Sequence, residues 1–379
     1  MNFRKTILAM SVSACTGVAM AADKTPTLGE VLKASGVTVN GYIDYSYNDR
    51  STDQSSNTYR AYDTERRGFN PQMADLSIGY LPASGFGGFA ELNYGSDAKV
   101  NSGLADPTGA SSASNFDAQQ VYMQYASGPL TVMAGKFDTI AGAEVIQAPS
   151  NTNFSRSFLF WLAEPAVHTG LRATYAPSDA VKFIAGVNNG WNVNKKSLKP
   201  AVGTPAQSPT GNLLELGVSG SPAKILSFAG MYCTGQESST PFGTALSKAG
   251  TRSLLDLVAT INATDAMSFV LAYDSGKQEY GKANGDAEWN GVAGYANYKF
   301  SDQWRLSLRT EKYKDKDAAT TGTVQTLKET TLTIGYAPAS NMELRAEYRG
   351  DKSDKQTFTE SGKATDKQNS LALEAVYKF

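Results

Sequence analysis

Apolar and polar residues alternate with unusual regularity between Thr330 and Arg349. The apolar positions are Leu332, Ile334 and Tyr336 on one side of a short connection, and Met342, Leu344, Ala346 and Tyr348 on the other. A period of two is typical of a strand with one apolar and one polar face. Pro338 and Asn341 in the connection favour a turn. The stretch is therefore predicted to be a β-hairpin, which a soluble sandwich could also contain.

The same period recurs along the rest of the chain and predicts about 16 strands. They lie near residues 37–47, 74–80, 86–94, 121–125, 130–134, 171–175, 181–187, 214–218, 226–232, 255–261, 267–273, 292–300, 304–308, 332–336, 342–348 and 371–379. Short turns alternate strictly with long polar loops, which are predicted at 48–68, 96–115, 138–166, 191–211, 234–251, 275–287, 314–324 and 352–366. An even strand number with short turns at one end is typical of an outer-membrane barrel.

Aromatic residues support a membrane location for these strands. One group flanks the short turns on the apolar parity: Tyr80, Phe86, Tyr125, Tyr175, Phe300, Trp304, Tyr336, Tyr377 and Phe379. A second group lies at the opposite strand ends: Tyr47, Tyr94, Tyr232, Tyr273 and Tyr348. Two aromatic bands match the two membrane interfaces. A large soluble β-protein would explain the alternation, but not the bands and the alternating loop lengths together.

The predicted fold is all-β, a transmembrane antiparallel up-and-down β-barrel with short periplasmic turns and long extracellular loops. An open sheet edge in lipid would leave backbone groups unpaired, so the first strand is expected to pair with the last. A barrel of this size encloses an aqueous channel. The polar parity would then face water inside the barrel, and the apolar parity would face lipid.

The amino terminus resembles a secretory signal peptide. Arg4 and Lys5 precede a short apolar run, and small residues surround a cleavage site near Ala21 or Ala22. Cys15 also fits a lipoprotein cleavage box, which is the less favoured interpretation. The predicted organisation is a signal peptide at 1–21, a short periplasmic segment at 22–36 with a helix capped by Thr27, and an outer-membrane barrel at 37–379.

Composition excludes some classes of function. Losing Arg4 and Lys5 would leave 33 of the 35 basic residues against 36 acidic ones, without the basic excess that a nucleic-acid-binding protein needs. Cys233 would be the one cysteine left, so no internal disulfide is expected. No phosphate loop, metal-ligand spacing or calcium loop is present in the sequence, so no cofactor and no metal site is predicted.

Several short motifs occur in an order that resembles Gram-negative outer-membrane porins, and more closely the OmpL-like β-barrel porin family. They are Gly41-Tyr42-Ile43-Asp44, Gly135-Lys136-Phe137, Gly142-Ala143-Glu144, Asn153-Phe154-Ser155-Arg156-Ser157, Pro165 with His168-Thr169-Gly170, Asn188-Asn189-Gly190-Trp191, and Phe379. The resemblance covers essentially the whole mature chain. It implies passive diffusion of small hydrophilic solutes, a homotrimer, and recognition of Phe379 by the outer-membrane assembly machinery. The partners it implies are outer-membrane lipid, lipopolysaccharide and the solutes.

The longest loop, 138–166, is the candidate constriction, because the third outer loop narrows the barrel in the porins that the chain resembles. Its candidate residues are Asp138, Glu144, Arg156, Trp161 and Glu164. The apolar run Phe158–Leu162 would be poorly placed in solvent and could fix the loop to the inner wall. A surface loop or a subunit contact is the alternative.

Strand parity nominates the residues of the pore wall. The candidate pore-lining residues are Arg172, Arg309, Arg345, Glu311, Glu347, Asp256 and Arg349. Opposite charges across a narrow, water-filled gap would select solutes by charge, although single residues could also merely solvate the lumen. On the inward parity the acids Asp44, Asp75, Glu91, Glu215, Asp256, Asp274, Glu311, Glu329, Glu343, Glu347 and Glu374 outnumber the bases Arg172, Lys182, Arg305, Arg309, Arg345 and Arg349. The excess predicts weak cation selectivity.

Two other classes of function stay open on sequence grounds. An outer-membrane hydrolase would need a histidine-based site, but His168 is the one histidine and has no partnered serine or aspartate in the sequence pattern. It is interpreted as a wall residue, and no enzymatic activity is predicted. An adhesive or structural barrel with a closed lumen is the stronger alternative.

Overall fold

The computed structural model describes residues 25–54, 58–63, 65–104, 113–195, 211–239, 245–279 and 285–379. Its helical elements are α1 (Leu28–Ser35), α2 (Ser96–Leu104), the 3-10 turn Ala148–Ser150 and the π-helical turn Leu159–Ala163. The strands are β1 (Thr38–Arg50), β2 (Arg67–Tyr80), β3 (Gly85–Tyr94), β4 (Phe116–Ser127), β5 (Leu130–Asp138), β6 (Val167–Ser178), β7 (Val181–Asn188), β8 (Leu213–Ala223), β9 (Leu226–Ser239), β10 (Ala245–Asn262), β11 (Met267–Glu279), β12 (Asp286–Lys299), β13 (Trp304–Asp315), β14 (Gln325–Ala339), β15 (Met342–Ser353), β16 (Phe358–Glu360), β17 (Lys363–Thr365) and β18 (Lys367–Lys378).

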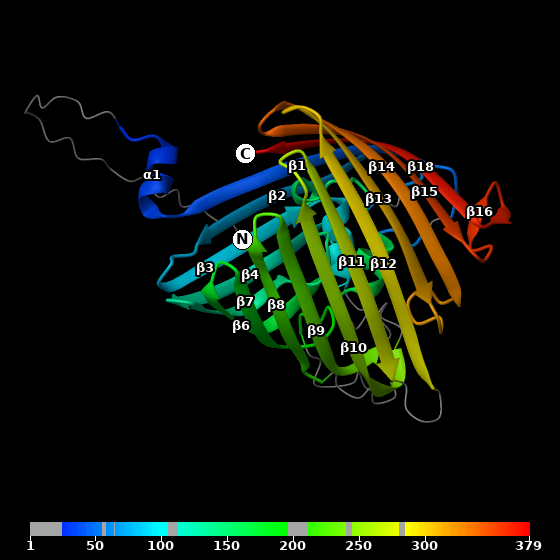
Figure 1. Ribbon diagram of the computed structural model, residues 1–379, viewed down its shortest axis with the longest axis horizontal. Coiled ribbons are helices and arrows are strands. Elements are labelled where there is room, and N and C mark those ends of the chain that lie inside the picture. Colours follow the sequence, from blue (N-terminus) through cyan, green and yellow to red (C-terminus); the bar gives the residue numbers. More distant parts are fainter. Residues whose placement is uncertain are drawn as a thin grey trace, which may run out of the picture.

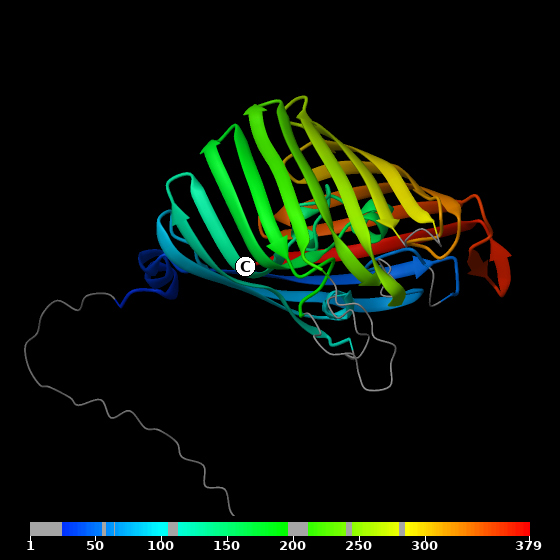
Figure 2. The same cartoon turned by 90° about the horizontal axis from the view of Figure 1, so that it is seen from below.

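Sixteen strands form one closed antiparallel barrel, β1 to β15 followed by β18 (Figures 1 and 2). Closure joins β1 to β18 with Tyr42 opposite Lys378. Two backbone hydrogen bonds of 3.0 Å between Gly41 and Phe379 complete the seam. Gly41 has no side chain at a point where a Cβ atom would fall 2.5 Å from the Phe379 ring. The predicted closure and strand number are confirmed.

The predicted strands all occur, but several continue farther toward the long-loop end. The loop predicted at 234–251 is an example, because β9 runs to Ser239 and β10 begins at Ala245. Above the lipid the outward residues are polar, so the apolar alternation ends there, whereas backbone pairing continues without an apolar face. The small hairpin β16–β17 and helix α2 both lie inside predicted loops and were missed. Figure 1 places the hairpin and α1 at opposite ends of the barrel.

Burial confirms the two faces. On β18, Leu371 and Leu373 are 62% and 59% exposed on the outside, whereas Ser370 and Glu374 are buried on the inside. The aromatic residues beside the short turns form contacts on the outer face, with ring centroids 4.5 Å apart for Trp304 and Tyr336. None of the described helices is long and apolar enough to cross a membrane.

Helix α1 begins as its capping pattern predicts. The Thr27 hydroxyl accepts a hydrogen bond from the Glu30 backbone N–H, and the Glu30 carboxylate accepts one from the Thr27 backbone N–H. Gly36 ends the helix with φ near 72°, a left-handed conformation that glycine adopts without strain. The predicted signal peptide and its cleavage site lie outside the described residues.

Candidate functional site

The loop between β5 and β6, residues 139–166, runs inside the barrel and is held there by the wall. Two wall glutamates bind its backbone. Glu347 on β15 accepts hydrogen bonds from the N–H groups of Phe154 and Ser155 at 2.7 and 3.0 Å. Glu311 on β13 accepts hydrogen bonds from the N–H groups of Phe158 and Leu159, farther along the loop. Carboxylate acceptors make such bonds stronger than bonds between neutral groups.

Wall arginines bind the loop carbonyls. Arg309 donates to the Ser155 carbonyl at 2.6 Å, and Arg349 donates to the Arg156 carbonyl at 2.5 Å. Lower on the wall, Arg345 donates to the Ala148 carbonyl at 3.2 Å. The alternating acids and bases of β13 and β15 therefore satisfy both the donors and the acceptors of one extended piece of loop backbone.

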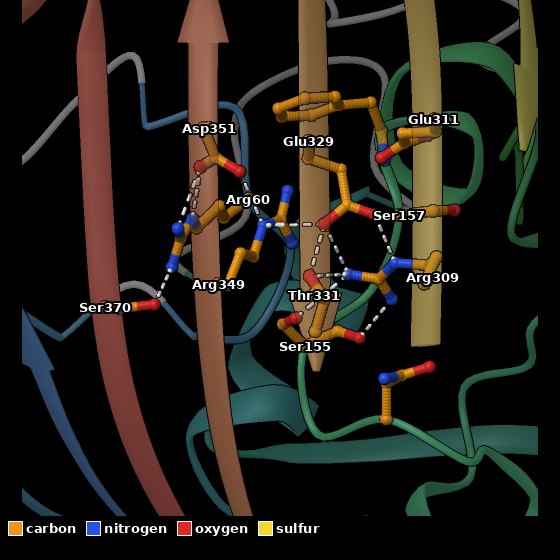
Figure 3. Close-up of polar contacts among 12 residues, drawn as sticks. Arg60, Ser155, Ser157, Arg309, Glu311, Glu329, Thr331, Arg349, Asp351 and Ser370 are labelled. Carbon is orange, nitrogen blue, oxygen red and sulfur yellow. Dashed lines mark hydrogen bonds and ion pairs between the residues drawn. The ribbon is translucent and has the colours of Figure 1, made fainter. Parts of the chain in front are cut away.

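The same wall residues form a buried ion-pair network (Figure 3). Arg309 lies between Glu329 on β14 and Glu144 of the loop, with N–O distances of 2.6 Å to each. Arg349 contacts Asp351 at 2.7 Å and Glu329 at 3.5 Å. Arg60, from the loop between β1 and β2, reaches the same Asp351 at 2.8 Å. The network thus joins two loops to three neighbouring wall strands.

An apolar contact fixes the end of the loop to β12 and β13. Phe158, Leu159, Phe160 and Leu162 are buried, while Trp161 is half-buried. Leu159 packs over Gly291, where a Cβ atom would lie 2.5 Å from its Cδ2 atom. Burying each such side chain contributes about 1.5–3 kcal/mol. The predicted packing of this run against the inner wall is confirmed.

The Arg156 side chain binds three carbonyl groups of its own loop. The Arg156 guanidinium donates to the carbonyl oxygens of Val145, Ile146 and Phe154 at 2.8–2.9 Å. It also lies 5.3 Å from the ring of Tyr62, a cation–π contact with the first loop. Burial raises the pKa of Tyr62, so its hydroxyl stays protonated and serves as a hydrogen-bond donor.

All the predicted pore-lining residues lie on the inward parity, but not beside open water. At most 6% of each residue is exposed to solvent. The set is Arg172, Arg309, Arg345, Glu311, Glu347, Asp256 and Arg349. The expected water-filled gap between facing charges is wrong at these positions. Five of them bind loop backbone, and the four arginines form ion pairs with neighbouring acids. Arg172, for example, pairs with Glu215 at 2.7 Å and stacks on the Phe137 ring.

The predicted loop residues have different positions. Asp138 ends β5 rather than lying in the loop, and accepts hydrogen bonds from Gln119 and Gln147 at 2.7 and 2.8 Å. Glu164 follows the π-helical turn and is buried with Asp256 and Asp274. Trp161 packs at the junction of two apolar clusters.

The sequence did not identify three residues of this site. Arg60 and Asp63, 2.6 Å apart, come from a loop that carries no periodic pattern and therefore gave no signal. Parity alone identifies Glu329 only as one of many inward acids. Its position opposite Glu311 on the neighbouring strand, with Arg309 two residues away from Glu311, could have marked it as an ion-pair partner.

The lumen beside the loop has a cavity of about 350 Å³ near the short-turn end. It lies between β1–β3 and the start of the loop, and its lining residues include Asn40, Tyr42, Asp75, Ser77, Glu91, Gln147 and Ser150. His168 lies elsewhere, buried between Phe137 and Thr139 with its Nε2 atom 3.3 Å from the Thr139 hydroxyl.

The sequence matches the family described as "Putative beta-barrel porin-2, OmpL-like" over residues 36–379. The chain belongs to this porin family. Its barrel is accordingly an outer-membrane one. A search of curated proteins finds no match to the sequence.

Solved structures share the fold of this porin-family barrel. The anion-selective porin from Comamonas acidovorans has 14% identity and a TM-score of 0.63, over 90% of this chain and 99% of that one. The outer-membrane channel DcaP of Acinetobacter baumannii has 14% identity and a TM-score of 0.60, over 90% and 97%. OmpT of Vibrio cholerae, in its trimer form, has 12% identity and a TM-score of 0.62, over 90% and 99%. Identities this low establish the fold alone.

Replacing Arg309 with alanine is expected to lower the free energy of unfolding by about 3–5 kcal/mol, because Glu144 would remain buried without a cation and Glu329 would keep only the more distant Arg349. Arg67→Ala is the matched control, because Arg67 pairs with Asp49 at the exposed rim, and its loss should cost about 1 kcal/mol or less. Denaturant unfolding of the refolded barrel, followed by tryptophan fluorescence, measures both. Equal losses of unfolding free energy in the two variants would contradict an anchoring role for Arg309.

Proposed function

We propose that the barrel is a porin that lets small hydrophilic solutes diffuse across the outer membrane, with the loop 139–166 as its constriction. The observation that carries the proposal is the attachment of this loop across the lumen to β13 and β15 through its own backbone. A loop on the surface or in a subunit contact would not require charged residues at every second position of β15 from Glu343 to Arg349. The loop would leave a narrowed path beside it, where the cavity near Asp75 and Glu91 lies.

The proposed weak cation selectivity rests on the inward charges that have no ion-pair partner. The inward arginines Arg172, Arg305, Arg309, Arg345 and Arg349 all take part in ion pairs. None of the ion pairs among the described residues includes Asp44, Asp75 or Glu91. Asp75 and Glu91 line the cavity together with Lys378, so acids outnumber bases beside the proposed solute path and would attract cations. The anion selectivity named for the Comamonas porin is a property of that protein.

Two rival functions make different predictions. A structural or adhesive barrel would have a closed lumen and would give no conductance steps. A hydrolase would depend on His168, whose described polar contact is a threonine hydroxyl. We propose that the protein has no enzymatic activity and that His168 is a wall residue. Lipase or protease activity lost in His168→Ala would overturn this.

Lipopolysaccharide is the proposed partner of the outer face. Lys312, Lys328, Lys352 and Lys367 stand directly opposite one another on β13, β14, β15 and β18, and all four are exposed. Like charges opposite one another on a sheet are destabilising unless anions compensate them. A hollow of about 470 Å³, lined in part by three of these lysines, Gly294 and Gly350, lies on the same face.

The lysine row stands at the height expected for lipid head groups. Four residues nearer the short turns, the same strands present Leu308, Leu332, Tyr348 and Leu371 to the lipid, again directly opposite one another. At about 3.3 Å per residue each lysine lies about 13 Å farther along its tilted strand than the apolar residue, toward the long loops. Lipid phosphates of the outer leaflet would neutralise them.

Recognition of Phe379 by the assembly machinery and a homotrimeric state complete the proposal. Phe379 is 59% exposed at the barrel seam, where a second protein could contact it. The related OmpT fold was solved in a trimer form.

Deleting residues 150–162 is expected to enlarge the single-channel conductance, because the constriction would be removed. Planar-bilayer recording measures it. Deletion of residues 360–363, the exposed tip of the β16–β17 hairpin, is the control and should leave conductance unchanged. Heat-modifiable migration in gels verifies that both variants form barrels. Unchanged conductance in the folded 150–162 deletion would remove the loop from the solute path.

The same recordings test selectivity. In a salt gradient the wild-type barrel should give a reversal potential of cation-selective sign. Asp75→Asn with Glu91→Gln should move it toward zero, since both side chains line the cavity beside the loop. Asp286→Asn with Glu279→Gln, two exposed rim residues, is the charge-matched control. A reversal potential of anion-selective sign for the wild type would reject cation selectivity.

Replacing Lys328 and Lys352 by glutamine is expected to weaken lipopolysaccharide binding about tenfold or more, at about 1 kcal/mol per lysine near an anionic surface. The control replaces Lys224 and Lys299, which are exposed at the short-turn end. Lipopolysaccharide retained by barrels purified from outer membranes, assayed as bound phosphate, measures the effect. Equal retention in both double variants would dismiss the lysine row as its site.

A further inference from the structure

Three carboxylates gather at one point on the inner wall, away from the arginine network. Asp256 on β10 stands directly opposite Asp274 on β11. Glu164, at the end of the inner loop, joins them, and one oxygen from each residue lies within 4.8 Å of the others. All three are buried, and the two aspartates are 0% exposed.

This cluster has no protein counter-charge in the part of the chain that the structure describes. None of the described ion pairs includes any of the three residues. Both oxygens of Asp256 and both oxygens of Asp274 also lack a hydrogen-bond donor. Glu329, a buried acid elsewhere on the wall, has an arginine partner. Four buried carboxylate oxygens without donors, directed at a third carboxylate, point to a missing cation.

We propose that Glu164, Asp256 and Asp274 bind a calcium ion. Hard divalent cations prefer oxygen ligands, and calcium accepts carboxylates in flexible geometry with six to eight ligands. Three carboxylates supply the charge, and water or backbone carbonyls can complete the shell. The ion would satisfy every carboxylate that the wall leaves unpaired at this point.

Calcium here would clamp the second end of the loop. Glu164 lies next to Ala163, whose carbonyl accepts a bond from the Trp289 indole at 3.3 Å. Gly142, near the start of the loop, approaches so closely that any side chain would overlap the Glu164 carboxylate. Both ends of the loop therefore meet at the cluster, opposite β10 and β11. The arginine network holds the middle of the loop on β13 to β15, and the ion would hold its ends on the other wall.

Terbium binding tests the site without measuring conductance, so its result is independent of the proposed channel activity. The refolded full-length barrel is treated with EGTA and titrated with Tb³⁺ while tryptophan is excited. Trp289 is close enough to the cluster to transfer energy to a bound lanthanide. We expect saturable luminescence that Ca²⁺ displaces.

Glu164→Gln and Asp274→Asn are each expected to raise the terbium dissociation constant by about tenfold or more, because ligand charge helps to set calcium-site affinity. Glu288→Gln removes an equal charge from an exposed residue beside Trp289 and should change it less than about twofold. Luminescence that is absent, or unchanged in all three variants, would overturn the proposal. Displacement by Mg²⁺ at lower concentration than Ca²⁺ would overturn the assignment to calcium.

Thermal unfolding provides a second readout. Calcium should raise the unfolding midpoint of the EGTA-treated wild type and raise that of Asp274→Asn by less. If the three carboxyl groups share protons instead of a metal ion, calcium will shift neither midpoint, and the proposal fails. Heat-modifiable migration shows whether each variant has folded.

Discussion

Charged side chains on the inner wall need partners, and a barrel of this width cannot supply them by packing its own side chains across the lumen. Sixteen strands enclose too much space for that. Without further cover, the wall charges would face water. Here the polypeptide itself covers them, because residues 139–166 enter the lumen and bring backbone N–H and carbonyl groups to the wall. These contacts with the wall hold the loop in its position inside the barrel.

The alternation of residues along β15 places its charged side chains against the loop. Glu343, Arg345, Glu347 and Arg349 recur at every second residue, so all four project to the inside. An extended chain lying against them presents donors and acceptors in turn, which glutamates and arginines can bind. Removing one member leaves its partners buried and unpaired, which is far more costly than removing an exposed pair. The loop is therefore held mainly through its backbone, while the Phe158–Leu162 run adds apolar burial at one end.

Much of the barrel could be predicted because its signals are local. The period of two places Leu332 outside and Thr333 inside without knowledge of any other strand, and the alternation of turn and loop lengths gives the strand number. The seam at Gly41 and Phe379 follows from the rule that lipid tolerates no open edge. The far ends of β9 and β10 could not be predicted, because above the lipid their outward residues become polar while backbone pairing continues.

The site was harder to predict because its contacts join distant parts of the chain. Parity correctly placed Arg309 and Glu347 inside, but could not show that Ser155 and Phe154 would cover them. Arg60 lies nearly 300 residues from Asp351, and no pattern connects the two. Ion pairing also changes how much each wall charge contributes to the electric field in the lumen. A count over the inward parity treats Arg309 and Asp75 as equal contributors to the field in the lumen. Arg309 is matched with acids and covered by the loop, whereas Asp75 has no ion pair among the described residues, so a count by parity gives the two residues a weight that their surroundings do not support.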